Sequence, residues 1–267
     1  MEGRGADCFP PFRLTQCAAP DTPPRSKAGH SMSDPTEPAV PAAEWRNFYG
    51  RRFGKTLRPS QKTYLSEDLD TLRPDGILTE ENPDHIPLNL LHVFGDARPV
   101  WLEIGFGGGE HMVHMAATYP DIGLIGCEPF INGVAMLLGR IRSAGVTNLA
   151  IHPGDVRDLF DVLPPASIAK AFLNYPDPWP KRRHHRRRFV TQDHLLPLAR
   201  ALRPGAEFRI ASDIPDYIRQ ARAEVPKAGF RLVQDGTTPW GDWLSTRYEV
   251  KALREGRPPH YLTFTRA

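Results

Sequence analysis

The sequence predicts an α/β fold with a doubly wound, mostly parallel sheet of seven strands. From residue 100 onward, short apolar runs alternate with segments that have the spacing of amphipathic helices. Acidic or glycine-rich turns follow several of these runs, where the carboxyl ends of parallel strands line a ligand crevice. A chain of 267 residues with 40% hydrophobic content suffices for one such domain and its appendages.

The expected strands and helices alternate along the chain. Strands are expected at 100–104, 123–127, 149–152, 169–173, 207–211, 230–233 and 261–264. Helices are expected at 110–119, at 131–143, from about 156, at 187–202 and at 217–228. Gly145 should end the second helix, and Pro204-Gly205 should end the fourth.

The N-terminal part differs in composition from the α/β domain at 99–267. Residues 1–43 are rich in Pro, Ala, Ser and Thr without apolar periodicity, which predicts a disordered tail. Residues 44–98 are expected to form a basic and aromatic N-terminal arm. Its mixed residues are Trp45, Arg46, Phe48, Tyr49, Arg51, Arg52, Phe53, Lys55 and Arg58. These aromatic rings either stack on nucleic-acid bases or dock on the domain, and the two interpretations are equally good.

The overall composition argues against several classes of protein. The net charge is only +3, so local basic runs carry more information than the total. Cys8, Cys17 and Cys127 lack C-x-x-C spacing, which argues against a disulfide framework or a zinc site and fits a reducing cytoplasm. We therefore expect no metal. A run of about 18 apolar residues is missing, so no membrane span is expected.

A glycine-rich turn, LEIGFGGGEH at 102–111, follows the first expected strand. Gly105 and Gly107 permit a tight turn and close approach of a ligand to the backbone. A dinucleotide fingerprint needs glycine where Glu110 stands. Glu103, two residues before Gly105, suits a ligand with a cationic group and is a poor neighbour for a pyrophosphate. The turn favours S-adenosylmethionine over NAD, with a plain strand–helix turn as the alternative.

Acidic residues also follow the second and third expected strands. Glu128 can accept both hydroxyls of an adenosine ribose, a feature that NAD and S-adenosylmethionine share. Asp155 can accept from the adenine amino group, or it can cap the helix that starts near residue 156. The sequence leaves both roles of Asp155 open.

The segment NYPDPWPKRRHHRRRFV at 174–190 follows the fourth expected strand. Its prolines fix φ, so we expect the chain to leave the strand rigidly extended. They bracket Asp177, which should face the crevice, and Trp179. Residues 181–188 are all Lys, Arg or His. This combination suits a polyanion that carries a base, while the alternative is a solvated basic start of a helix.

Two further polar groups lie near the end of the chain. Asp213 follows the fifth expected strand and either contacts substrate or caps the next helix. The cluster at 246–249 has no clear place in the element pattern, and its composition alone predicts an ordinary surface position.

Together these segments resemble the bacterial tRNA (guanine-N7)-methyltransferase family from Leu57 to Ala267. The motifs are LEIGFGGG, GCEPF, YPDPWPKRRHHRRR, ASD at 211–213 and TRYE at 246–249. The resemblance implies a class I, Rossmann-like methyltransferase domain at 99–267 with S-adenosylmethionine as cofactor and tRNA as partner. It implies no metal, and no obligatory protein partner is evident.

The resemblance also implies residue roles. Cofactor-binding residues would be Glu103, Gly105, Gly107, Glu128, Asp155 and Asp177. Substrate-binding residues would be Lys181, Asp213, Thr246, Arg247, Tyr248 and Glu249. Two positions depart from the family pattern: Tyr175 stands where Phe is frequent, and Pro180 where His is frequent. No general base can therefore be assigned to Pro180.

The implied reaction methylates N7 of guanosine 46 in the tRNA variable loop. Guanine N7 carries a lone pair and no proton, so the reaction needs alignment and no general base. Asp177 is the expected catalytic residue, because a carboxylate stabilises the positive charge that develops on the base. The basic run disfavours a protein or small-molecule methyltransferase. The acids Glu103, Glu128 and Asp177 disfavour a non-catalytic RNA-binding protein.

Overall fold

The computed structural model describes residues 48–267. The expected tail at 1–43 and the first residues of the expected arm lie outside the described residues. The described chain lies within a single compact unit, Asn47–Ala267.

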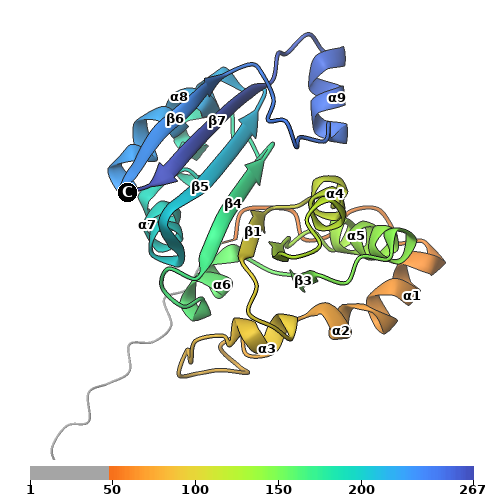
Figure 1. The fold of residues 1–267 in the computed structure, drawn as a ribbon. Coiled ribbons are helices and arrows are strands. Elements are labelled where there is room, and N and C mark those ends of the chain that lie inside the picture. Colours follow the sequence, from red (N-terminus) through yellow and green to blue (C-terminus); the bar gives the residue numbers. More distant parts are fainter. Residues whose placement is uncertain (1–47) are drawn as a thin grey trace, which may run out of the picture. The chain divides into compact units, whose positions relative to one another are not determined.

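A seven-stranded sheet forms the centre of this unit, with the strand order β3-β2-β1-β4-β5-β7-β6 (Figure 1). The strands are β1 (Val100–Ile104), β2 (Gly123–Cys127), β3 (Leu149–His152), β4 (Ile168–Asn174), β5 (Leu202–Ser212), β6 (Phe230–Gly236) and β7 (His260–Arg266). Strands β1 to β5 are parallel to one another, and β7 is antiparallel to both β5 and β6. The expectation of a mostly parallel, seven-stranded sheet is confirmed.

The strand order reverses at β1, which lies between β2 and β4. Open α/β sheets bind ligands at such a reversal, outside the carboxyl ends of the strands. The glycine-rich turn follows β1, and the segment with Asp177 follows β4. The topology therefore brings these two motifs to the same edge.

Helices connect the strands and precede the sheet. They are α1 (Pro59–Glu67), α2 (Leu69–Leu72), α3 (Leu90–Phe94), α4 (Glu110–Thr118), α5 (Ile131–Ala144), α6 (Val156–Val162), α7 (Gln192–Ala201), α8 (Pro215–Glu224) and α9 (Arg247–Arg254). Short 3₁₀ helices lie at Arg182–Arg187 and Pro226–Ala228. Among the described residues, no helix is long and apolar enough to cross a membrane.

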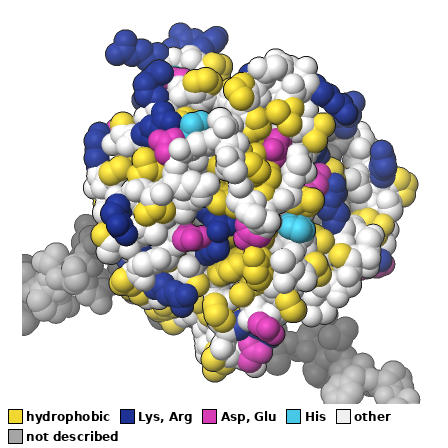
Figure 2. Space-filling view, turned by 45° about the horizontal axis from the view of Figure 1, so that its top comes forward, with side chains coloured by type: hydrophobic (Ala, Val, Ile, Leu, Met, Phe, Trp, Pro, Cys, Tyr) yellow, Lys and Arg dark blue, Asp and Glu magenta, His cyan; other side chains and the backbone are white. Residues whose placement is uncertain are grey.

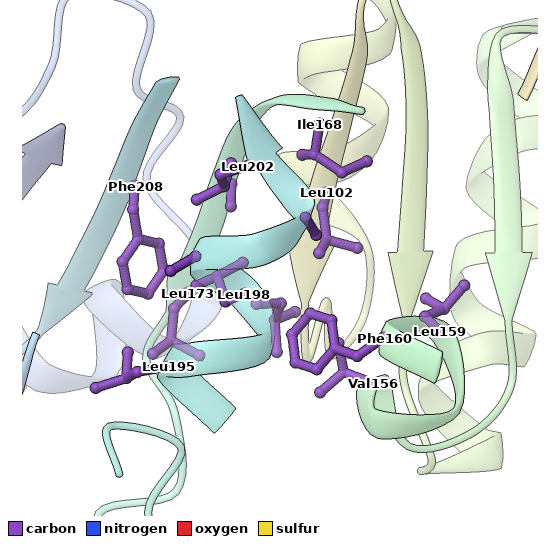
Figure 3. Packing of buried hydrophobic residues seen from close by; sticks show 14 of the residues in the cluster. Leu102, Val156, Leu159, Phe160, Ile168, Leu173, Leu195, Leu198, Leu202 and Phe208 are labelled. Carbon is purple, nitrogen blue, oxygen red and sulfur yellow. The ribbon is translucent and has the colours of Figure 1, made fainter. Parts of the chain in front are cut away.

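Alternating residues of the central strand supply cores on both faces of the sheet. Leu102 and Ile104 of β1 pack in one cluster with residues of α6, α7 and α8, which Figure 3 shows in part. Trp101 packs on the other face with residues of α4 and α5, and α1 and α2 cover that cluster from outside. Burial on both faces explains why the parallel strands read as continuous apolar runs.

The expected long helix at 187–202 is wrong at its start, whereas its end at Ala201 adjoins the expected Leu202. Helix α7 begins only at Gln192, because the chain is extended at Arg188 (ψ 148°) and at its N-cap Thr191 (ψ 159°). Extension carries the Arg188 and Val190 side chains into the protein, where both are fully buried. Pro204-Gly205 does not end the helix but lies inside β5, which starts at Leu202.

The expected helix at 217–228 is shifted and shorter. Helix α8 starts at Pro215, since proline is favoured at the first helical position. It ends at Glu224, and Pro226 opens a separate 3₁₀ turn because proline cannot continue a helix.

Buried Arg188 holds the segment after β4 in place. Its Nε donates to the Pro178 carbonyl at 2.8 Å, and its Nη2 lies 2.7 Å from Asp216 Oδ2. Its Nη1 donates to Gln220 Oε1 at 2.9 Å. Helix α8 therefore anchors the proline-rich segment through one guanidinium group.

We predict that Arg188→Ala lowers the free energy of unfolding by about 3 kcal/mol, at the low end for breaking a buried ion pair because Asp216 is partly exposed. Urea denaturation measures this effect. The matched control is Arg186→Ala, whose side chain is exposed two positions earlier and should change stability by less than about 0.5 kcal/mol. Equal stability of the two variants would contradict the anchoring role.

Candidate nucleic-acid and cofactor site

The carboxyl edge of the sheet carries the acidic residues that follow β1 to β4. Figure 2 turns this edge toward the reader, with many Lys and Arg side chains around the margin of the face and acidic side chains both within it and near its margin. A surface with this distribution of charge can accept a cationic group at its acids and a polyanion at its cations.

The glycine-rich turn leaves backbone accessible to a ligand. Gly105 is exposed with φ 68°, and a Cβ atom built on it would meet no atom within 4 Å. The turn also packs closely against α5, because a Cβ on Gly133 would lie 2.2 Å from the carbonyl oxygen of Gly107. Glycine is thus required at 133 for close packing of the turn on α5, and at 105 for conformation.

Glu128 joins the turn to α5 from the end of β2. Its Oε2 accepts the N–H of Gly107 at 2.7 Å, and its Oε1 accepts the N–H of Phe130 at 2.9 Å. Burial raises the pKa of the Glu128 carboxyl above its ordinary value, although both N–H groups favour the charged form. The charge of Asp177 raises this pKa further, which places the two expected site carboxylates in the same electrostatic environment.

Glu103 is buried at the end of β1, with a side chain only 2% exposed. Its Oε2 lies 2.8 Å from Nδ1 of His111 in α4. Its Oε1 has no hydrogen bond to another described residue. His111 was not among the site residues expected from the sequence, although an ionisable residue in the first turn of the helix after the glycines was a signal for it.

Asp155 caps α6 and forms an ion pair. Its Oδ1 accepts the N–H of Arg157 at 3.0 Å, and its Oδ2 lies 2.6 Å from Arg157 Nη2. Desolvation alone would raise the pKa of the Asp155 carboxyl, but the bonds from Arg157 outweigh it and the pKa is lowered. Of the two open roles, the structure shows the helix cap, and the contact with adenine stays a prediction.

Asp177 lies in the loop after β4, and this loop is not simply extended. Tyr175 (φ 50°) and Trp179 (φ 39°) both adopt left-handed backbone conformations, each directly before a proline. The expectation of a rigid extended exit is therefore wrong, since the loop turns twice. Aromatic residues rarely adopt positive φ, so surrounding contacts must hold these turns.

The Asp177 carboxyl reaches solvent while protein atoms surround it on several sides. Desolvation raises its pKa above the ordinary value, and the positive charge of Arg51 opposes this shift. The interaction with Arg51 shows that the described part of the arm approaches the site.

The arm is attached on both sides of the crevice. On one side, the guanidinium of Arg187 lies between the rings of Tyr49 and Trp179, at 4.5 and 4.9 Å from their centroids. On the other side, Asn132 at the start of α5 accepts the N–H of Gly54 and donates to the Lys55 carbonyl, both at 2.7 Å. Because β1 lies between β2 and β4, the arm passes over the end of β1.

This arrangement bears on the two interpretations of the arm. Tyr49 docks on Arg187 and remains 41% exposed, whereas Phe53 is 74% exposed. Docking is therefore observed for Tyr49, and stacking on bases stays a prediction for Phe53.

The basic run divides into exposed and inward-facing residues. Exposed cations are Lys181, Arg182, Arg183 and Arg186. Arg187 and Arg188 instead hold the loop and the arm. Of the alternative, a solvated basic helix start, the structure shows a short 3₁₀ helix at 182–187 with exposed cations, followed by the buried Arg188.

The tetrad at 246–249 begins α9 beside the glycine-rich turn. Thr246 caps this helix, with its Oγ1 accepting the N–H of Glu249 at 3.3 Å. A Cβ on Gly107 would lie 3.2 Å from Tyr248 Cε2, and one on Gly108 would lie 2.9 Å from Arg247 Nη2. The expectation of an ordinary surface position is wrong for Thr246 and Glu249, each only 6% exposed.

Glu249 binds an aromatic cluster under the site. Its Oε1 accepts from the Tyr261 hydroxyl and its Oε2 from Trp243 Nε1, each at 2.6 Å. Tyr175, in the loop that carries Asp177, packs against the same cluster. Glu249 thus ties α9 to the loop after β4, and a direct contact with substrate stays a prediction.

Asp213 is paired and does not cap α8. Its Oδ2 lies 2.5 Å from Arg257 Nε. The N-cap of α8 is Ile214, whose N–H donates to Ser212 Oγ at 3.2 Å. The helix-cap interpretation is wrong, and the contact with substrate stays a prediction.

The acceptor groups and open backbone of this site fit S-adenosylmethionine. Glu103 Oε1 can receive an ammonium group, the Glu128 carboxylate can receive ribose hydroxyls, and the backbone is open over Gly105. Within residues 48–267, no group of three or more His, Cys, Asp and Glu side chains is arranged to hold a metal ion.

The chain is similar to known methyltransferases. Residues 97–262 match a family described as putative methyltransferases. The chain is 72% identical over 240 residues to a protein named tRNA (guanine-N(7)-)-methyltransferase from Cereibacter sphaeroides, covering 88% of this chain and 99% of that protein. Identity to a protein of the same name from Paracoccus denitrificans is 73% over 221 residues, covering 83% of this chain and 95% of that protein.

Two solved structures share the fold. An antibiotic-related methyltransferase has a TM-score of 0.51 and 19% identity, covering 72% of this chain and 97% of that chain. The 16S rRNA methyltransferase KamB has a TM-score of 0.52 and 16% identity, covering 67% and 92%. The described residues therefore have a Rossmann-like methyltransferase fold. The two relatives are 72% and 73% identical to this chain over 99% and 95% of their own lengths. The chain therefore belongs to the tRNA (guanine-N7)-methyltransferase family.

Proposed function

We propose that this protein transfers the methyl group of S-adenosylmethionine to N7 of guanosine 46 in the variable loop of tRNA. The observation that carries the proposal is the position of Asp177 between the acidic cofactor crevice and the exposed cations that follow it. The relatives named tRNA (guanine-N(7)-)-methyltransferase support a guanine of tRNA as the substrate. We assign the activity to the cytoplasm, where tRNA is available.

Asp177 is the proposed catalytic residue. Bound S-adenosylmethionine supplies an electrophilic methyl group. As N7 of guanine takes up this group, positive charge moves onto the base, and the Asp177 carboxylate stabilises that charge. Its raised pKa reflects incomplete solvation, which strengthens an interaction with a cation held nearby.

The tetrad at 246–249 is proposed to hold the base near the donor. Arg247 and Tyr248 lie against Gly107 and Gly108, so they adjoin the backbone that would contact the cofactor. Both side chains are partly or largely exposed and can reach a base placed at the crevice mouth. Lys181 and Asp213 are proposed to contact the substrate from the loops after β4 and β5.

The direct test is to map 7-methylguanosine in tRNA after incubation with the protein and S-adenosylmethionine. We expect one modified position, guanosine 46, and no product on a transcript with adenosine there. Methylation of that altered transcript at another guanine would overturn the proposed position. Absence of tRNA methylation together with methylation of a protein would overturn the substrate class.

We predict that Asp177→Asn lowers kcat for tRNA methylation roughly 100-fold, the size expected when one preorganised electrostatic group is removed. Binding of S-adenosylhomocysteine should remain close to that of the unchanged protein, which calorimetry measures. The matched control is Asp213→Asn on the next loop, because Asp213 is paired with Arg257 and should influence KM more than kcat. Near-normal kcat for Asp177→Asn would sink the catalytic assignment.

The same variant yields a prediction for stability. Folding raises the pKa of Asp177 above its ordinary value of 3.8, so the ionised carboxyl destabilises the folded state at neutral pH. Asp177→Asn should therefore melt at a higher temperature than the unchanged protein at pH 7. This advantage should shrink as the pH falls through the raised pKa and vanish below 3.8. A lower melting temperature at pH 7 would contradict the argument.

The exposed cations provide a prediction for tRNA binding. Replacing Arg182, Arg183 and Arg186 with Ala should weaken tRNA binding and flatten its salt dependence by about 0.7–0.9 in log–log slope for each phosphate that is no longer neutralised. Fluorescence anisotropy at several salt concentrations measures the slope. Arg203→Ala, exposed at the start of β5 and hence at the opposite edge of the sheet, is the control. An unchanged slope in the triple variant would move tRNA docking elsewhere.

A further inference from the structure

His111 is a buried side chain at the centre of the site without a role in the proposed chemistry. Its side chain is 2% exposed, and its Nδ1 lies 2.8 Å from Glu103 Oε2. Its ring packs edge-on against Phe172 of β4, with 4.9 Å between ring centroids, and lies 5.3 Å from the ring of Trp243. His111 therefore contacts the cofactor side of the site and the segment that leads to α9.

The contacts of His111 specify where its hydrogen lies. An ionised carboxylate only accepts hydrogen bonds, so the hydrogen shared with Glu103 resides on Nδ1. Among the described residues, Nε2 is buried without a hydrogen-bond partner. A hydrogen on Nε2 would create a buried donor without an acceptor, which is unfavourable. A hydrogen on Nδ1 is therefore the arrangement that fits these contacts.

This hydrogen bond divides the two oxygens of Glu103 between different tasks. Oε2 is held by His111, and Oε1 has no hydrogen bond to another described residue. Without this bond, no hydrogen bond to another described residue would hold the Glu103 carboxyl in one orientation. A Glu103 side chain in an unfixed rotamer would be a weaker acceptor for an ammonium group.

We propose that His111 is a positioning residue that fixes the orientation of the Glu103 carboxyl and directs its free oxygen toward the amino group of the methyl donor. The inference rests on the proposed function, which assigns Glu103 to the cofactor. It predicts that His111 acts on the amino-acid half of the ligand and leaves the adenosine half unaffected.

Two probes separate these halves. S-adenosylhomocysteine carries the amino group, whereas 5′-methylthioadenosine has the same adenosine and sulfur without the amino-acid part. Calorimetry would compare both ligands on the unchanged protein, His111→Phe and His111→Asn. Phenylalanine keeps a ring against Phe172 and Trp243 but cannot donate. Asparagine is a poorer packing substitute, but its amide N–H can replace the Nδ1 donor.

For His111→Phe we expect S-adenosylhomocysteine to bind roughly 10- to 100-fold more weakly, as for removal of a hydrogen bond to a charged group. Binding of 5′-methylthioadenosine should change less than about twofold, and His111→Asn should recover most of the affinity. If His111 acted only by filling space, His111→Asn should weaken S-adenosylhomocysteine binding more than His111→Phe. Equal weakening of both ligands in His111→Phe, or none, would overturn the inference.

Glu103→Gln supplies an independent check through a double-variant cycle. If His111 acts through Glu103, then His111→Phe should weaken S-adenosylhomocysteine binding little further in the Glu103→Gln background. Additive losses in the double variant would show that His111 does not act through Glu103. Failure of the unchanged protein to bind S-adenosylhomocysteine would overturn the cofactor assignment itself, which distinguishes that failure from failure of the His111 inference.

Discussion

The buried carboxylate of Glu128 accepts one N–H from the glycine-rich turn and one from the start of α5, and the site is built around this pair of bonds. They hold the turn after β1 against the helix after β2. That helix start, through Asn132, then binds the arm that crosses the end of β1. A substitution of Glu128 would therefore affect the position of the glycine-rich turn and, through the start of α5, the position of the arm. The raised pKa of Glu128 indicates that burial works against its ionised form.

A second set of contacts connects the cofactor side with the proposed substrate side. Glu103 bonds to His111, whose ring packs on Trp243, and Trp243 donates to Glu249 in α9. Hydrogen bonds at the two carboxylates and ring packing between them restrict the orientation of each side chain relative to the next. The proposed substrate tetrad is thereby connected to β1, the strand that carries Glu103, the proposed cofactor-binding carboxylate.

The basic run shows how similar side chains acquire different tasks. Arg188 is enclosed and bonds to Pro178 and Asp216, and Arg187 lies between two aromatic rings. These contacts offset the unfavourable backbone conformation of Trp179, whose φ is 39°. The cations that remain exposed surround the loop of Asp177. The basic run therefore has two tasks. Arg187 and Arg188 stabilise the strained loop, and the exposed cations are proposed to bind tRNA phosphates.

The sequence by itself determined the strand positions, the parallel sheet and the acids at the strand ends, because apolar periodicity and turn residues are local signals. The family motifs pointed to the same edge. Only the tertiary structure decided that Arg188 is buried, since its partner Asp216 lies 28 positions away and no local pattern announces the pairing. The same holds for Asp213 with Arg257 and for the burial of Glu249 against Tyr261. From the sequence alone, a charged residue is predicted to be exposed to solvent. Its burial requires a partner of opposite charge or a hydrogen bond, and contacts between distant segments supply that partner.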